Sequence, residues 1–129
     1  MDQVVITKLK STAIKPICTY NGYDLFSEKD YTIFPNKSAK VKTYIKMTFP
    51  ASLYCELDEV ERYSRCYNAG IRSWLIDVDE DGGIDVEIIN FSKTEKLQIL
   101  RGYKIVHISC QEYPIPMQIN YPTTLTNFF

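Results

Sequence analysis

The chain has 129 residues, enough for one domain with a hydrophobic core but not for two. It is 45% hydrophobic and 24% charged with a net charge of −1, an ordinary soluble composition that gives no general attraction to nucleic acid. No apolar run is long enough to span a membrane, and the N-terminus lacks the apolar segment of a signal peptide. We therefore expect an intracellular protein, in the cytoplasm or nucleus, that binds neither nucleic acid nor membrane.

Short strands follow one another along the chain. The ten tyrosines and six phenylalanines favour strands. Only residues 58–69 have some helical character, and Lys37, Lys40, Lys42 and Lys46 fit the solvated face of a strand. Many short strands at close turn spacing predict an all-β sandwich or barrel. The expected strands cover residues 4–9, 23–27, 31–34, 39–49, 53–57, 97–100 and 103–110.

The four cysteines are scattered and form no C-x-x-C pair, and the chain has a single histidine. A zinc site needs three or four such ligands at close spacing, so we do not expect one. The thiols are interpreted as reduced. The four are Cys18, Cys55, Cys66 and Cys110.

Residues 71–90 have the pattern of a β-hairpin with an acidic turn. Trp74 lies in the first strand, and Gly82 and Gly83 allow positive φ in a turn over residues 79–83. Ile84, Val86 and Ile88 then alternate with polar residues, as in a half-buried strand. Clustered carboxylates repel one another unless a cation or hydrogen-bond donors offset the repulsion. The turn is therefore either a binding or catalytic site or the remains of one. The carboxylates are Asp77, Asp79, Glu80, Asp81 and Asp85.

Three interpretations of this hairpin remain open on local grounds. The series Asp77-x-Asp79-x-Asp81-Gly82 fits the start of an EF-hand calcium loop. However, Ile88 stands where the bidentate Glu belongs, and the flanks have the pattern of strands. A calcium-binding acidic turn on a β-domain is the weaker form of this interpretation. A solvated acidic turn without function, and a nucleotide site, are the other two.

Three motifs resemble those of the trimeric dUTPases, in the same order. Residues 22–27 (Gly-Tyr-Asp-Leu-Phe-Ser) are similar to the first motif, and residues 75–82 to the third. Residues 101–108 are similar to the fourth. The resemblance covers nearly the whole chain and implies a β-rich jelly-roll-like barrel that forms a homotrimer with active sites at subunit contacts. It implies a barrel over residues 1–112 and a C-terminal arm over residues 113–129, exchanged between subunits.

The resemblance also implies roles for individual residues. Asp77 stands at the position of the water-activating Asp, and Asp24 at the position of the first-motif Asp near magnesium. Magnesium is expected only if the protein is active, and no cofactor otherwise. If the site is active, the substrate-binding residues are Gly22, Tyr23, Asp79, Glu80, Gly82, Arg62 and Ser64.

Other motif positions depart from the pattern. The Arg and Ser of the second motif fall on Val60 and Glu61 in a gapless register, although a shift brings in Arg62 and Ser64. The third-motif Tyr is Glu80, the fourth-motif Gln is His107, and residues 113–129 do not resemble the glycine-rich fifth motif. A carboxylate in place of a guanidinium repels phosphates.

The residues that resemble the family's scaffold are kept, whereas several residues that would contact the ligand are replaced. This pattern predicts a catalytically degenerate dUTPase-like protein. We expect a binding or regulatory protein of viral origin with an unidentified protein partner. The alternative is an active dUTP diphosphatase, or a related nucleotide hydrolase, with a rebuilt site that converts dUTP to dUMP and pyrophosphate.

Overall fold

A computed structural model describes residues 4–58, 69–78, 81–112 and 122–124, and these residues form twelve strands and no helix. The all-β prediction is confirmed. The first six strands are β1 (Val5–Lys8), β2 (Ile17–Thr19), β3 (Gly22–Phe26), β4 (Tyr31–Ile33), β5 (Ser38–Lys42) and β6 (Ile45–Pro50). The other six are β7 (Leu53–Asp58), β8 (Ala69–Val78), β9 (Ile84–Asn90), β10 (Leu97–Ile99), β11 (Lys104–Glu112) and β12 (Pro122–Thr124).

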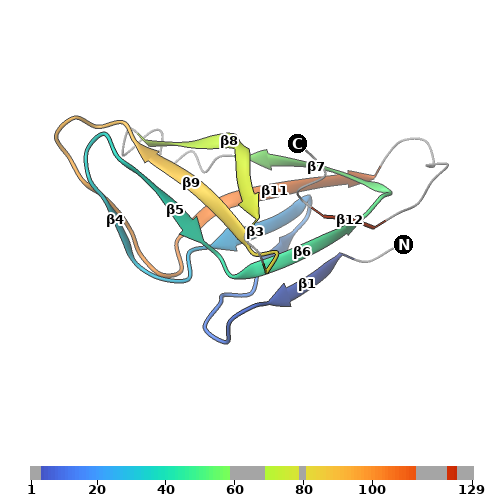
Figure 1. Ribbon diagram of the computed structural model, residues 1–129. Coiled ribbons are helices and arrows are strands. Elements are labelled where there is room, and N and C mark those ends of the chain that lie inside the picture. The colour runs from blue at the N-terminus through green and yellow to red at the C-terminus, as the bar shows by residue number, and fades with distance from the viewer. Residues whose placement is uncertain (1–3, 59–68, 79–80, 113–121, 125–129) are drawn as a thin grey trace.

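The strands form four small antiparallel sheets around one interior (Figure 1). Their orders are β1-β6-β12, β10-β4, β2-β3-β11-β7 and β5-β9-β8. Most hydrogen-bonded strand pairs in these sheets join strands that are distant in sequence. For example, β11 lies between β3 and β7. The first and fourth motifs are therefore paired strands of one sheet, whereas the third motif lies in another.

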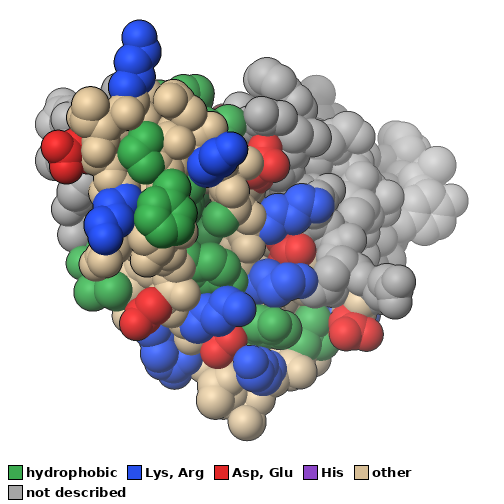
Figure 2. All heavy atoms as spheres, turned by 60° about the vertical axis from the view of Figure 1, so that its left-hand side comes forward, with side chains coloured by type: hydrophobic (Ala, Val, Ile, Leu, Met, Phe, Trp, Pro, Cys, Tyr) green, Lys and Arg blue, Asp and Glu red, His purple; other side chains and the backbone are tan. Residues whose placement is uncertain are grey.

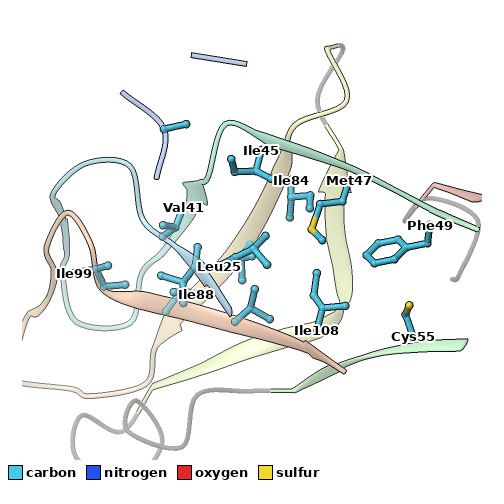
Figure 3. Close-up of a cluster of buried hydrophobic side chains, with 14 of the residues drawn as sticks. Leu25, Val41, Ile45, Met47, Phe49, Cys55, Ile84, Ile88, Ile99 and Ile108 are labelled. Carbon is cyan, nitrogen blue, oxygen red and sulfur yellow. The ribbon is translucent and has the colours of Figure 1, made fainter. Parts of the chain in front are cut away.

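One hydrophobic cluster receives side chains from all four sheets. Figure 3 shows Leu25 and Ile108 of the β3-β11 pair facing Val41 and Ile88 of the β5-β9 pair. Phe49 of β6 is fully buried at one end of this cluster, beside Cys55. The alternating apolar positions of the sequence thus face inward, as strand periodicity requires.

The prediction of a single strand over residues 39–49 is wrong. The chain turns a corner at Thr43 and Tyr44, so that β5 pairs with β9 and β6 pairs with β1. Tyr44 has φ of 54°, a left-handed conformation that ends strand pairing. Every second residue from Val41 to Phe49 is nevertheless buried, so the corner leaves no trace in the hydrophobic alternation.

Replacing Thr43 with valine should destabilise this corner. The buried Thr43 hydroxyl donates to the Ile84 carbonyl oxygen at 2.9 Å and accepts from the Ile45 backbone N–H at 3.1 Å. Valine keeps the shape but leaves a buried N–H unpaired, which costs about 1–3 kcal/mol. Urea unfolding measures this loss. Thr32→Val, at an exposed strand position, is the matched control, and equal effects of the two variants would contradict the assignment.

The predicted hairpin over residues 74–90 is confirmed. β8 and β9 are antiparallel, with Val78 opposite Ile84 and a register shift between Ile71 and Ile76. Gly82 has φ of 87°, as expected for the turn. The EF-hand interpretation is wrong, because both flanks of the loop are strands and an EF-hand requires helices.

Several expectations fall on residues that the structure does not describe. The possible helix lies mostly within residues 59–68, and most of the proposed C-terminal arm lies within residues 113–121 and 125–129. Residues 122–124 pair with β6 of the same chain, and exchange of the arm between subunits stays a prediction. In the part of the chain that is described, no helix has the length and apolar character to cross a membrane.

Candidate functional site

A row of polar residues crosses the outer face of the β2-β3-β11-β7 sheet. His107 of β11 lies opposite Asp24 of β3 on one side and opposite Asp58 of β7 on the other. Their sequence neighbours Leu25 and Ile108 are buried in the core. Because side chains alternate across a strand, the three polar residues must face outward. The sheet thus brings a first-motif and a fourth-motif residue into direct contact.

The imidazole of His107 lies between two oxygen atoms. Nδ1 is 2.7 Å from Oδ1 of Asp24, and it donates because an ionised carboxylate can only accept. Nε2 is 3.1 Å from Oδ1 of Asn21, an oxygen that also accepts from the Thr19 hydroxyl at 3.1 Å. Both oxygens are acceptors, so the two contacts are hydrogen bonds at the same time only when both ring nitrogens carry a proton.

A second basic group lies near the same carboxylate. The ammonium nitrogen of Lys104 is 3.9 Å from Oδ1 of Asp24, the oxygen that also contacts His107. On the far side of His107, the Ser109 hydroxyl donates to the Asp58 carboxylate. Asp24 and Asp58 thus each have a protein partner on β11.

Two other first-motif residues have structural contacts. A Cβ atom on Gly22 would lie 1.8 Å from the carbonyl oxygen of Ile108, so only glycine allows β3 to approach β11 this closely. Tyr23 is partly buried and packs against the core. Burial, followed by the charge that the neighbouring Cys18 thiol can carry, raises the pKa of its phenol. The structure therefore gives both residues a role in packing.

Asp77 lies on a different sheet from Asp24. It is on β8, opposite Asp85 of β9, and Asp85 in turn lies opposite Lys42 of β5. The Asp85 side chain is 7% exposed, and its Oδ2 is 3.4 Å from the Lys42 ammonium nitrogen. Within one chain, the residues resembling the catalytic base and the metal-site acid are therefore not on a shared sheet.

The turn itself is only partly described. Asp81 is exposed, and a Cβ atom on Gly82 would lie 3.0 Å from Cδ of Lys46, which covers the turn. The other proposed ligands lie outside the described residues, and they are Asp79, Glu80, Arg62 and Ser64.

The lysines of β5 and β6 lie on a face of mixed charge. Figure 2 shows one face of the molecule, on which Lys and Arg side chains are interspersed with Asp, Glu and hydrophobic ones. Lys10 is 3.2 Å from the buried Glu28 carboxylate, and Lys42 pairs with Asp85 as described above. The ammonium groups of Lys10 and Lys42 lie 4.7 and 5.8 Å from the ring centroid of Tyr44. The lysines predicted on one strand face are therefore divided between the turn before β5, β5 and β6, and Lys42 pairs with a buried carboxylate.

Arg101, the first residue of the fourth-motif segment, joins three loops of the scaffold. Its guanidinium donates to the carbonyl oxygens of Thr12 at 2.7 Å and Glu28 at 2.6 Å. Its backbone N–H donates to the Asp30 carboxylate at 2.7 Å. Gly102 follows with φ of 88° and turns the chain into β11. These contacts position the strand that carries His107.

Comparison with known proteins agrees with this architecture. The family model for dUTPase matches residues 18–127. The chain is 34% identical to mouse deoxyuridine 5'-triphosphate nucleotidohydrolase over 95 residues, which cover 74% of the chain and 58% of the mouse protein. It is 28% identical to the fowlpox virus protein of the same name, over 95% of the chain and 86% of the viral protein.

Solved structures show the same fold. A point mutant of the dUTPase from phage phi11 of S. aureus superposes with a TM-score of 0.73 at 18% identity, covering 92% of the chain and 95% of the phage chain. A Staphylococcus bacteriophage 80alpha dUTPase with dUPNHPP gives a TM-score of 0.73 at 18% identity, covering 92% of the chain and 88% of the phage chain.

The fold and the ordered motifs define a protein of the dUTPase class, with its jelly-roll-like architecture. Since the family model matches most of its length, the chain belongs to the dUTPase family. The chain spans about half the length of the mammalian relatives, with 58%, 37% and 46% of the mouse, human and rat proteins covered.

Magnesium does not fit at Asp24 as the residues of one chain are arranged. The Asp24 oxygen Oδ1 contacts His107 and lies 3.9 Å from the Lys104 ammonium nitrogen, a positive charge that repels cations. Among the described residues, no group of three or more His, Cys, Asp or Glu is placed to hold a metal.

The sequence identified His107 as a departure from the fourth motif but did not indicate which side chains it contacts. Asn21 and Lys104 belong to the site only because β3 and β11 pair in this register. Asp58 and Ser109 were missed for the same reason, since they meet across the β7-β11 pair. The sequence signal was the pair of polar residues two apart on β11, which places both on one face of the strand.

Proposed function

We propose that this dUTPase-family protein binds or regulates another protein and does not hydrolyse dUTP efficiently. The observation that carries the proposal is the 2.7 Å contact between His107 and Asp24. Phosphoryl transfer depends on a metal ion and on donors that position the phosphates. In this chain the acid that would serve the metal is held by an imidazole.

The sequence supports the same conclusion at two further positions. Glu80 replaces the third-motif Tyr, and Glu61 falls at the second-motif Ser in the gapless register. Both add negative charge where a triphosphate would bind, and like charges repel a nucleotide over several ångströms. Asp77 alone cannot supply the positioning that this reaction requires.

An active dUTP diphosphatase is the second candidate. It is favoured by the retention of both Asp24 and Asp77, and by relatives whose names denote dUTP hydrolysis. This function requires His107 to leave Asp24 when nucleotide and metal bind. The two candidates therefore differ in whether Asp24 becomes available.

We also propose that the protein assembles as a homotrimer. The outer face of the β2-β3-β11-β7 sheet exposes Ile17 and Tyr54, which are 56% and 45% accessible, on either side of the polar row. Apolar side chains rimmed by polar ones are typical of association surfaces. Light scattering should give three times the mass of the chain at micromolar concentration, and a monomer would contradict the proposal.

Calorimetric titration tests the functional proposal. A non-hydrolysable dUTP analogue, added with magnesium, should give no binding heat up to millimolar concentration. The variants Asp24→Asn and Asp77→Asn should behave like the wild type, as should the control Glu95→Gln at an exposed position outside the motifs. Micromolar binding that both Asp variants lose and the control keeps would support the active enzyme instead.

A further inference from the structure

Two cysteines far apart in the sequence meet across one strand pair. Cys55 of β7 lies directly opposite Cys110 of β11, and their sulfur atoms are 3.3 Å apart. Directly opposed residues of an antiparallel pair have Cα atoms about 4.5 or 5.5 Å apart, and both spacings lie within the range of a disulfide. Closing the bond would move the sulfurs together by about 1.2 Å. The register therefore places the two thiols within the distance range from which a disulfide can form.

We propose that Cys55 and Cys110 form a dithiol modification site that peroxides convert to an intramolecular disulfide. Two buried cysteines in a core are ordinarily inert packing residues. This pair differs because Cys110 is only partly buried, whereas Cys55, directly opposite it on β7, is buried beside Phe49 (Figure 3). A partly exposed thiol with a buried thiol directly beside it is the arrangement of an attacking and a resolving cysteine.

The electrostatics assign these two roles. The Cys55 thiol donates its hydrogen bond to the Cys110 sulfur, which lowers the pKa of Cys110 from its ordinary value. The same contact, together with burial, raises the pKa of Cys55. The thiolate is the reactive form, so Cys110 reacts first.

The reaction balances with hydrogen peroxide as the only oxidant. The Cys110 sulfur attacks one peroxide oxygen, the O–O bond breaks, and hydroxide leaves, which gives a sulfenic acid. The Cys55 sulfur then attacks the Cys110 sulfur, the S–O bond breaks, and the hydroxyl leaves as water with the thiol proton. In total, two thiols and one peroxide give one disulfide and two waters.

The exposed Cys18 provides a matched control. It lies on β2, opposite Tyr23 of β3, and β3 separates it from β11. Two strand spacings are about 10 Å, which is beyond the reach of a disulfide. Cys18 is more accessible than Cys110 but has neither of the two other described cysteines within disulfide reach. Accessibility alone would therefore favour Cys18, whereas geometry favours the Cys55–Cys110 pair.

The test treats the full chain with hydrogen peroxide, caps the remaining thiols with a maleimide under denaturing conditions, and reads the intact mass. Two of the four cysteines should escape capping together, and peptide mapping should identify a Cys55–Cys110 link. Cys18→Ser should still form the link. Cys55→Ser should stop at a sulfenic acid on Cys110, which dimedone traps.

Two results would overturn the proposal. One is retention of all four thiols in the folded wild type at peroxide concentrations that oxidise free cysteine. The other is a disulfide that includes Cys66 or Cys18 in place of the assigned pair. Because serine variants can fold poorly, circular dichroism accompanies each one. The wild-type mapping decides the question without any variant.

Discussion

The Gly22→Ala variant is expected to lose about 4 kcal/mol or more of folding free energy, enough to leave little folded protein. The added Cβ atom would lie 1.8 Å from the carbonyl oxygen of Ile108 and 2.8 Å from its carbonyl carbon. Both are backbone atoms of β11, so no side-chain rotation relieves the clash. The two strands must separate, and the contact between Asp24 and His107 is lost with them.

Gly102→Ala is the control for this substitution. Gly102 has a positive φ of 88°, but its Cβ atom would meet nothing closer than Cδ1 of Ile14 at 3.9 Å. Only backbone strain remains, which costs about 1–2 kcal/mol. Urea unfolding followed by circular dichroism compares the two variants. If Gly22→Ala costs no more than Gly102→Ala, the close approach of β3 to β11 is wrong.

Phe49→Ala should destabilise the fold by about 3–5 kcal/mol. Phe49 is fully buried where β6 faces the β7-β11 pair, and Figure 3 shows its ring beside Cys55. Truncation leaves a cavity between two sheets, and strands on both sides are held by their own hydrogen bonds and cannot collapse into it. The melting temperature and the urea midpoint should both fall.

The matched truncation Phe91→Ala removes the same atoms from a ring that is 53% exposed. Its expected cost is about 0.5 kcal/mol or less, as for surface substitutions generally. A cost similar to that of Phe49→Ala would mean that Phe91 is buried in the assembly. It would then report on a contact between subunits and not on the core.

The strands and the hairpin could be predicted because their signals are local. Alternation over residues 84–88 and the Gly-Gly turn before it predict a strand and its connection, and both are observed. The expectation that this strand is only half-buried is wrong, because the polar Asp85 and Asn90 are buried as well. The corner at Tyr44 could not be predicted in this way. The inward alternation continues through it, and only the hydrogen bonds of Thr43 to a distant strand show where the sheet changes.

The candidate site was predictable only in part because it is assembled by long-range pairing. The motifs supplied Asp24 and marked His107 as a substitution, but nothing in the spacing of 83 residues indicates that the two side chains touch. The same holds for Cys55 and Cys110, which were interpreted as separate thiols and lie 3.3 Å apart. Such contacts follow from the register in which distant strands pair, and this register cannot be predicted from a single sequence.

Magnesium-dependent release of pyrophosphate from dUTP tests the central claim most directly. The wild-type protein, at a concentration where light scattering has established its oligomeric state, is compared with protein-free buffer and with an active dUTPase. The proposed function predicts release indistinguishable from buffer, and at least about a thousandfold slower than the active enzyme, because Asp24 contacts His107 and Glu80 stands at the third-motif Tyr position. Steady turnover of dUTP that Asp77→Asn abolishes would contradict it.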